Sequence, residues 1–306
     1  MVAFPTETVY GLGAAARNSA AIRRLFAVKG RPADHPVIVH LAGADAMPEW
    51  TSRVPPAAVH LADAFWPGPL TLVLPRAAHV LDLVTGGQET VALRVPSHPI
   101  AHQLLKAFGD GVVAPSANRF GRLSPTRADH VHAELGDAVG LILDGGPTDV
   151  GVESTIVDLS GDRPVLLRPG GITPAQLAAI LGTPPEAPHA ASPRASGTLP
   201  SHYAPRTPLG VIPPDDLEER ADQLAAAGSR VAVLARRKAP LVRSGIAWHP
   251  TSADAADYAR ALYATLRELD ACGYDCILVE EVPEGDEWLA IRDRLRRAAY
   301  RGEEDR

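Results

Sequence analysis

A proline-rich stretch of 26 residues, from Gly182 to Thr207, most constrains how this chain can fold. It holds six prolines, with alanine, serine and glycine between them, and it shows neither helical nor strand periodicity. Proline fixes φ and supplies no N–H, so a segment this dense in proline cannot continue a helix or a central strand. We therefore expect a linker and lid over 182–207, between a catalytic domain over 1–181 and a second domain over 208–306.

Short apolar runs alternate with helical patterns on both sides of this linker. Strands are expected where apolar or β-branched residues follow one another, at residues 2–4, 37–41, 70–74, 91–95, 141–143, 154–159, 165–167, 209–212, 231–234 and 276–279. Helices are expected where apolar residues recur at helical spacing, at residues 18–30, 56–65, 100–108, 126–135, 174–181, 217–227, 253–269 and 287–300. Ser124 before Pro125 predicts an N-cap and a first helical position. The alternation predicts an α/β or α+β sheet domain, followed by a smaller three-layer α/β domain.

The composition excludes several classes of protein. The chain has 30 basic and 36 acidic residues, a net charge of −6, and neither half is basic, which argues against binding of nucleic acid by bulk charge. No apolar run approaches the roughly 20 residues that cross a bilayer, and the first residues lack the pattern of a signal peptide. Two cysteines are too few for a disulfide framework or a zinc site. We therefore expect a soluble cytoplasmic protein with no membrane partner.

Four stretches place polar side chains beside glycine or proline in apolar surroundings. They are residues 5–13, 29–32, 114–118 and 151–156, the last followed one hairpin later by residues 167–170. Each suits a turn that faces a ligand. The first suits equally well a strand with a solvated threonine face, and the third is also ordinary turn chemistry. Phosphate loops of the Gly-x-x-x-x-Gly-Lys type, zinc-protease motifs, nucleophile elbows and a glycine-rich dinucleotide turn are missing from the sequence.

Cations within these stretches are candidates for binding anions. Lys29 and Arg31 flank Gly30 at the end of the first predicted helix, where they either complement the helix dipole or hold phosphates. The chain has only three lysines, which favours a functional role for Lys29. Arg94 and Arg168 lie at the ends of apolar runs, where a buried guanidinium needs an anionic partner.

Taken together and in this order, the motifs resemble the threonylcarbamoyl-AMP synthase family, whose catalytic part is a YrdC-like domain. The matching motifs are PTETVYGLG (5–13), KGRP (29–32), WPGPLT (66–71), RVPSHP (94–99), APSAN (114–118), GVESTI (151–156) and LRPG (167–170). Two later motifs, HYAP (202–205) and AIRDRL (290–295), resemble the long form of the family, which carries an extra C-terminal domain. The resemblance implies a twisted mixed sheet with flanking helices and a concave cleft, plus a smaller Rossmann-like three-layer α/β domain.

The activity that the resemblance implies is that of a nucleotidyltransferase. The resemblance implies an L-threonylcarbamoyladenylate synthase, which makes threonylcarbamoyl-AMP and pyrophosphate from L-threonine, bicarbonate and ATP with Mg²⁺. The product then feeds the tRNA threonylcarbamoyltransferase machinery. Because a carbamate must attack the α-phosphorus of ATP, the protein has to bring two anions together, and positioning and electrostatic stabilisation should carry the catalysis.

The resemblance also implies roles for individual residues. The expected catalytic residues are Lys29, Arg31, Ser116 and Asn118. Those expected to bind L-threonine are Thr8, His40, Arg94 and Ser154, with the Arg94 guanidinium as a fork for the carboxylate. Those expected to bind ATP are Arg31, His35, Thr90, Ser116, Ser124, Arg168 and Tyr203. Tyr203 lies on the linker and would close the cleft over ATP, whereas no metal ligands are assigned.

Two features depart from the family pattern. Relatives usually have a helix and part of a strand before the first motif, whereas only four residues precede it in this sequence. The stability of the first strand is therefore an open question. The linker also lacks basic residues directly before His202. An alternative function is an RNA-binding or ribosome-maturation protein that uses the concave surface, although the acidic charge weighs against stable RNA binding. A carbamoyl-transfer protein of the hydrogenase-maturation type would carry zinc-binding cysteines that this chain lacks.

Overall fold

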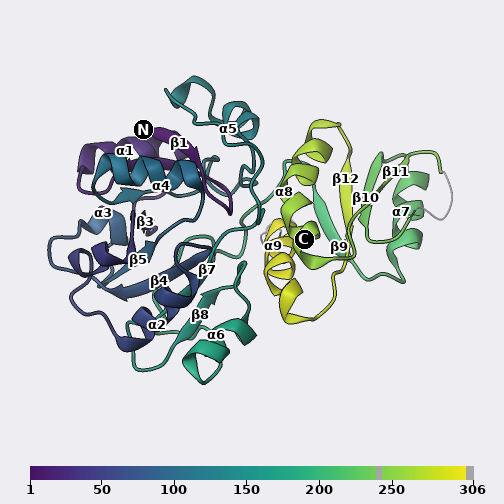
Figure 1. Ribbon diagram of the computed structural model, residues 1–306. Coiled ribbons are helices and arrows are strands. Elements are labelled where there is room, and N and C mark those ends of the chain that lie inside the picture. Colours follow the sequence, from purple (N-terminus) through teal and green to yellow (C-terminus); the bar gives the residue numbers. More distant parts are fainter. Residues whose placement is uncertain (239–242, 301–306) are drawn as a thin grey trace. The chain divides into compact units, whose positions relative to one another are not determined.

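The computed structural model describes residues 1–238 and 243–300 (Figure 1). The chain divides into two compact units. The first comprises residues 1–120 and 124–198, and the second comprises residues 121–123 and 199–306. The proline-rich segment is therefore shared, because residues up to Thr198 pack with the first unit and those from Leu199 with the second.

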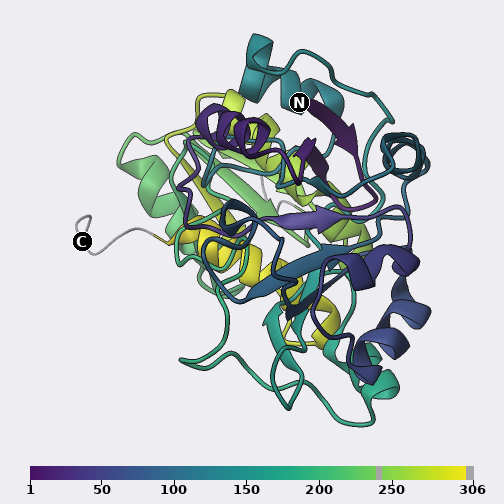
Figure 2. The same ribbon diagram turned by 90° about the vertical axis from the view of Figure 1, so that its left-hand side faces the viewer.

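The first unit is built on an eight-stranded mixed sheet. Its strands are β1 (Val2–Pro5), β2 (Tyr10–Ala15), β3 (Ile38–His40), β4 (Leu70–Pro75), β5 (Thr90–Arg94), β6 (Val112–Val113), β7 (Thr155–Asp158) and β8 (Val165–Arg168). They lie in the order β1-β2-β6-β3-β5-β4-β7-β8. The pairs β3–β5 and β4–β7 are parallel and the other neighbours are antiparallel. The N-terminus enters at the β1 edge (Figure 2), and β1 pairs with β2 over four residues.

Helices of the first unit follow the strands at short spacing. They are α1 (Ser19–Lys29), α2 (Pro56–Phe65), α3 (Asp82–Thr85), α4 (Pro99–Phe108), α5 (Ala128–Leu135) and α6 (Pro174–Leu181), with 3₁₀ turns η1 (Ala44–Glu49) and η2 (Gly136–Ala138). As predicted, Asn18 caps α1 by accepting from the Ala21 N–H, and Gly30 ends it with φ 63°. Lys29 and Arg31 are thereby held at a defined helix end.

The two faces of this sheet are covered differently. Because successive side chains of a strand point to opposite faces, Val39, Leu72 and Val157 join the main core, which also contains the apolar residues of α1, α2, α5 and α6. Their strand neighbours Ile38, Val73 and Ile156 join a separate cluster that includes Ala195 of the proline-rich segment. The part of this second face formed by β3, β4 and β7 is thus covered by chain without helix or strand, whereas α4 packs on Phe4 and Val112 at the β1 and β6 end.

Two local predictions for the first unit are wrong, and one open alternative is decided. Residues 141–143 form no strand and contribute a single bridge, between Ile142 and Ala3. Ser124 is no N-cap, because α5 begins at Ala128 after Arg127. For residues 5–13 both a ligand-facing turn and a strand were open, and the structure forms β2 from Tyr10, whose Gly13 is needed because a Cβ there would lie 2.8 Å from the Phe4 ring.

The second unit is a four-stranded parallel sheet with helices on both faces. Its strands are β9 (Leu209–Ile212), β10 (Val231–Ala235), β11 (Ile246–Pro250) and β12 (Cys276–Glu280), in the order β11-β10-β12-β9. Its helices are α7 (Leu217–Ala226), α8 (Ala255–Ala271) and α9 (Leu289–Ala299), with a 3₁₀ turn η3 (Asp286–Trp288). In Figure 1, α7 lies on one side of these strands and α8 and α9 lie on the other. The expected three-layer α/β architecture is confirmed, although β11 was not predicted.

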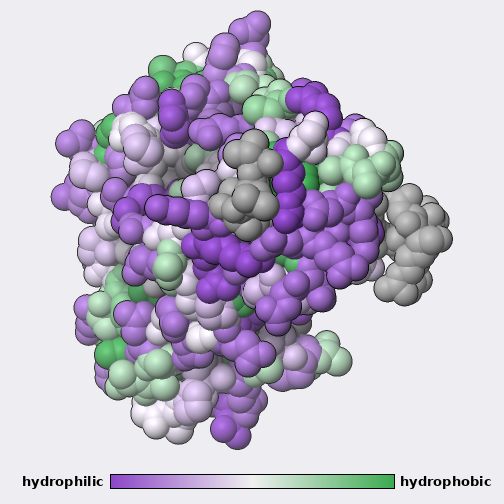
Figure 3. Space-filling view, turned by 90° about the vertical axis from the view of Figure 1, so that its right-hand side faces the viewer, coloured by the Kyte–Doolittle hydropathy of each residue, from purple (hydrophilic) through white to green (hydrophobic). Residues whose placement is uncertain are grey.

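Surface properties agree with a chain that keeps its apolar residues inside. Hydrophilic side chains dominate the face seen in Figure 3. The exposed large hydrophobic residues of the described chain fall on different elements and are Val59, Phe108, Leu141, Ile180 and Tyr300. Within residues 1–238 and 243–300, no helix combines the length and the apolar character that a membrane crossing needs.

Candidate active site

The end of α1 places a lysine against the loop that follows β6. Lys29 is only 2% exposed, and its ammonium group donates to the main-chain oxygens of Ser116 and Asn118, both at 2.5 Å. The same loop also donates to Lys29, since the Phe120 N–H binds the Lys29 main-chain oxygen at 2.8 Å. An ammonium has three N–H donors, so one remains for a substrate oxygen. Three of the four expected catalytic residues are thus brought together.

Two buried cations lie next to each other at this helix end. Burial, and then the nearby Arg31 guanidinium, holds the pKa of Lys29 well below its usual value of 10.5. Arg31 is also buried, and its Nη2 donates to the Pro36 carbonyl oxygen at 2.7 Å. The His35 ring lies 5.2 Å from the Phe120 ring, and burial followed by the Arg31 charge lowers its pKa. An anionic ligand here would relieve the repulsion between Lys29 and Arg31.

Arg94 is held by a carboxylate that the sequence analysis gave no role. Its Nη2 donates to Glu7 Oε1 at 2.7 Å and its Nε donates to the Gly68 oxygen at 3.3 Å. The second oxygen of Glu7 accepts from the Ser97 N–H at 3.1 Å. Both members of the ion pair are buried. Arg94 is therefore only partly available as a fork, and its remaining N–H groups on Nη1 and Nη2 are those that a substrate carboxylate can engage.

His40 lies beside Arg94 because β3 and β5 are parallel and these two residues are paired in register. Burial, and then the Arg94 charge, lowers the pKa of His40 to about 3, so the ring is neutral near pH 7. Its Nδ1 is buried without a hydrogen-bond partner. A neutral ring with an unused nitrogen can accept or donate one hydrogen bond to a ligand.

Hydroxyl groups complete this part of the sheet. The Thr8 hydroxyl lies 2.8 Å from the Thr6 hydroxyl, which itself donates to the Val9 oxygen at 2.7 Å. The Thr8 hydroxyl is thus left as the donor between the two, with its oxygen lone pairs available. The Ser154 hydroxyl lies 2.8 Å from that of Thr71.

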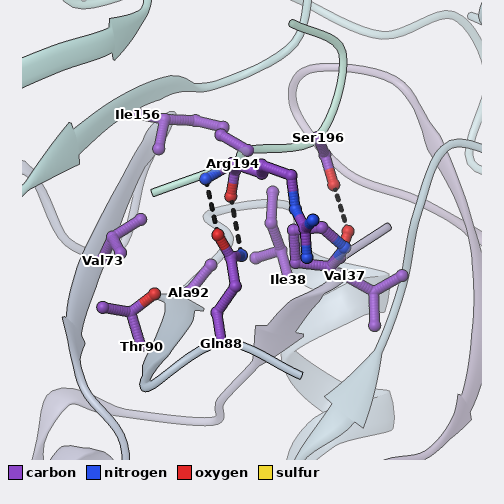
Figure 4. Close-up of a pocket in the computed structure, with 11 residues that line it drawn as sticks. Val37, Ile38, Val73, Gln88, Thr90, Ala92, Ile156, Arg194 and Ser196 are labelled. Carbon is purple, nitrogen blue, oxygen red and sulfur yellow. Dashed lines mark hydrogen bonds between the residues drawn. The ribbon is translucent and has the colours of Figure 1, made fainter. Parts of the chain in front are cut away.

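The expected nucleotide residues reach the same site through Ser154 and the proline-rich segment. Arg168 Nη2 donates to Ser154 Oγ at 3.1 Å, and its Nη1 donates to the Ser196 main-chain oxygen at 2.8 Å. Arg31 Nη2 donates to Ser196 Oγ at 3.2 Å. Thr90 lines a cavity of about 10 Å³ beneath this segment (Figure 4). The Ser124 hydroxyl donates to Glu153 Oε1 at 2.5 Å, next to Ser154 in the chain.

Tyr203 is the one expected site residue that belongs to the second unit. It is buried with φ 60°, its ring stacks on Tyr263 at 5.9 Å, and the Arg294 guanidinium lies 5.0 Å from its ring centre. All the other expected residues lie in the first unit.

Sequence reasoning missed several residues that hold the site together. Glu7 was inside a quoted motif but received no role, and Thr71, Glu153 and Ser196 were identified only by their contacts. A signal was available for Glu7, because a buried arginine such as Arg94 needs a carboxylate partner. Across the described part of the chain, no three His, Cys, Asp or Glu side chains form a group that could hold a metal ion.

Two family models together match nearly the whole chain. A model named for Sua5, YciO and YrdC, described as "Telomere recombination", matches residues 1–170. A second model, described as "Threonylcarbamoyl-AMP synthase, C-terminal domain", matches residues 172–300.

Relatives of known sequence and structure are similar over the same length. The chain is 41% identical over 309 residues to the threonylcarbamoyl-AMP synthase of Bacillus subtilis (strain 168), which covers 98% of this chain and 89% of the relative. It is 40% identical over 314 residues to the synthase of Pyrococcus abyssi, with 98% and 90% covered. The crystal structure of P. abyssi Sua5 complexed with L-threonine aligns with a TM-score of 0.90 and 39% identity, over 97% of this chain and 90% of that one.

Proposed function

This chain belongs to the threonylcarbamoyl-AMP synthase family, as its motifs predicted, and from that premise we propose how its own residues perform the reaction. The substrates are L-threonine, bicarbonate and ATP, and the products are threonylcarbamoyl-AMP and pyrophosphate. A continuous series of contacts supports this proposal most directly. It runs from Ser154 through Arg168 and Ser196 to Arg31, and so connects the expected threonine residues with the expected phosphate residues.

L-Threonine binds at the ends of β3 and β5 in this proposal. The free N–H groups of Arg94 hold the carboxylate, and the Thr8 and Ser154 hydroxyls and the neutral His40 ring complete the pocket. Glu7 keeps the Arg94 charge paired while the pocket is empty. Threonine is a zwitterion and brings no net charge, so the buried Glu7–Arg94 pair stays balanced when it binds.

ATP binds along Arg31, His35, Thr90, Ser116, Ser124 and Arg168, with Lys29 and Asn118 at the junction of the two subsites. The threonine ammonium group loses a proton, and the amine adds to bicarbonate with loss of water to give a carbamate. A carbamate oxygen then attacks the α-phosphorus, and pyrophosphate leaves as that bond forms. Positive charge from Lys29 and Arg31 stabilises the negative charge that gathers on the phosphate oxygens in the transition state. Mg²⁺ would enter as a complex with ATP and would neutralise part of the triphosphate charge.

Tyr203 contacts the bound ATP in this proposal. Six residues separate it from Ser196, a span of about 25 Å at most for an extended chain, so the length of the chain permits Tyr203 to approach ATP held by Arg31 and Arg168. The product passes to the tRNA threonylcarbamoyltransferase machinery, and the enzyme works in the cytoplasm, where ATP and tRNA are found.

The experiment that tests this function measures pyrophosphate release with ATP, Mg²⁺ and bicarbonate, with and without L-threonine. We expect release to depend on threonine, because without it no carbamate forms to attack the phosphorus. Lys29→Ala and Arg31→Ala should each lower the rate by about 100-fold or more, as expected for removal of a charge that stabilises the transition state.

Matched controls are Lys106→Ala and Arg127→Ala, which remove exposed cations elsewhere in the first unit and should leave the rate unchanged. Release without threonine would contradict the reaction. Normal turnover in the Lys29 or Arg31 variants would contradict the assignment of the phosphate site.

A further inference from the structure

A short piece of the proline-rich segment, residues 194–196, lies on the second face of the first unit's sheet. Ala195 packs there with Ile38, Val73 and Ile156. Figure 4 shows this piece above the sheet, with the Gln88 side chain reaching up to it from the loop before β5. Residues 194–196 therefore line the same small cavity as Thr90, one of the expected nucleotide residues.

Gln88 pairs with this segment as a second strand would. Its Oε1 accepts from the Arg194 N–H at 2.7 Å, and its Nε2 donates to the Arg194 main-chain oxygen at 3.1 Å. Since one side-chain amide satisfies both main-chain groups of Arg194, it fixes the position and the direction of the chain at that residue. Hydrogen bonds from Arg194 Nη2 to the Gly86 oxygen and from Ser196 Oγ to the Pro36 oxygen, both 2.8 Å, hold the same piece on either side.

Gln88 itself rests on a rigid turn. Its Nε2 also donates to the Thr85 oxygen at 3.2 Å, at the end of α3. Gly86 follows with φ 62°, and a Cβ at this position would lie 2.2 Å from the Asp34 oxygen. The turn thus requires glycine both for its backbone conformation and for its close packing, so the amide that holds Arg194 has a fixed base.

The held segment contacts two guanidinium groups. Ser196 accepts from Arg31 through its hydroxyl at 3.2 Å and from Arg168 through its main-chain oxygen at 2.8 Å. Arg31 and Arg168 are 165 and 28 residues away from Ser196 in sequence, so nothing local fixes their spacing. Ser196 thus holds one nitrogen of each guanidinium at a defined place.

We propose that Gln88 is a positioning residue for nucleotide binding, which acts by holding residues 194–196 so that Ser196 orients Arg31 and Arg168 toward the triphosphate. This inference rests on the proposed function, because it takes the ligand of these two arginines to be ATP. Gln88 does not touch the reacting atoms. Its loss releases the segment, and ATP must then order the segment and both side chains at the cost of affinity.

The first test uses the full chain and trypsin, without substrates. The bond between Arg194 and Ala195 is a tryptic site, and cleavage yields fragments 1–194 and 195–306. We expect Gln88→Met and Gln88→Ala to speed this cut about tenfold, because two hydrogen bonds that resist opening are lost. Methionine keeps the length of the side chain, so a packing role alone would leave Gln88→Met like the wild type. Glu89→Ala, an exposed neighbour, is the control and should cut at the wild-type rate.

The second test separates the two substrates. In both Gln88 variants we expect the KM for ATP to rise about fivefold to tenfold, while kcat and the KM for threonine change less than twofold. ATP alone should slow the cut at Arg194 in the wild-type chain. An unchanged cut and an unchanged KM for ATP would overturn the proposal, and so would a lower KM for ATP, which would make the segment an obstacle to the nucleotide.

These two tests also distinguish the inference from the function it rests on. If the wild-type chain released no threonine-dependent pyrophosphate, the proposed reaction would fail. ATP protection of Arg194 and its loss in Gln88→Met would still support Gln88 as the residue that positions a nucleotide site. If pyrophosphate release were normal and Gln88→Met behaved as the wild type in both assays, only the inference would fail.

Discussion

At the scale of single residues, the candidate site is characterised by charged and titratable groups that are buried. Lys29 has two of its donors engaged, Arg94 is paired with Glu7, and His40 is held neutral beside Arg94. Burying such groups costs free energy unless they are paired or neutral. Pairing fixes the positions of Lys29 and Arg94. The requirement that His40 stays neutral makes the stability of the folded chain depend on pH.

The depressed pKa of His40 predicts how stability changes with pH. Its pKa is about 3 in the folded chain and 6.5 when unperturbed. Between these values the unfolded chain binds a proton that the folded chain does not, so the free energy of unfolding falls as pH falls below about 6.5. The slope from this group approaches about 1.4 kcal/mol per pH unit. Urea unfolding of the wild type and of His40→Gln at pH 7, 6 and 5 measures the difference.

We expect the stability advantage of the wild type over His40→Gln to shrink with each step toward acid. Other titrating groups act in both chains, so they cancel in this comparison. If the free energies of unfolding of the two chains instead differed by the same amount at pH 7, 6 and 5, His40 would take up its proton in the folded chain as it does in the unfolded chain.

At the scale of elements, some predictions followed directly from local chemistry and others could not. Proline at the first helical position and glycine after the last predicted the bounds of α6 without error. The sequence left β2 open between a turn and a strand because Gly11 and Gly13 are typical of turns, whereas here glycine is required because Phe4 and Ala114 approach this strand closely. β11 was missed because it is an edge strand that contains tryptophan, histidine and proline, with little apolar alternation.

The two ends of α1 offer a matched pair of substitutions. Asn18→Ala removes the N-cap, and Gly30→Ala places a side chain at φ 63° with no atom within 4 Å of its Cβ. Each should cost about 1 kcal/mol of stability, the first through a lost cap and the second through left-handed backbone strain. Only Gly30→Ala should also lower pyrophosphate release, severalfold, because Lys29 and Arg31 flank it. Thermal unfolding and the release assay on both variants check this. Equal activity of the two variants would show that the conformation of the helix end does not determine the positions of Lys29 and Arg31.

At the scale of the whole molecule, the contacts that build the site join residues far apart in sequence. Glu7 and Arg94 are 87 residues apart, and Gln88 and Arg194 are 106 apart. Periodicity and turn chemistry act over a few residues, so they predicted the elements and the motif positions but not these partners. The family resemblance supplied the roles of the motif residues. It did not supply Ser196, because that contact depends on how the proline-rich segment crosses the sheet.

Tyr203 provides the last prediction, since it belongs to the second unit while its proposed ligand binds the first. Tyr203→Ala removes a ring that stacks on Tyr263 and lies against Arg294, so the second unit should lose about 3–5 kcal/mol of stability. We also expect it to weaken ATP binding about tenfold or more, with threonine binding nearly unchanged, as measured by calorimetry on the folded chain. Leu217→Ala is the control, because Leu217 is buried in a different cluster of the second unit, whose buried members belong to α7, β10 and β12. If both variants weakened ATP alike, the effect would come from loss of stability in the second unit, and Tyr203 would have no part in holding the nucleotide.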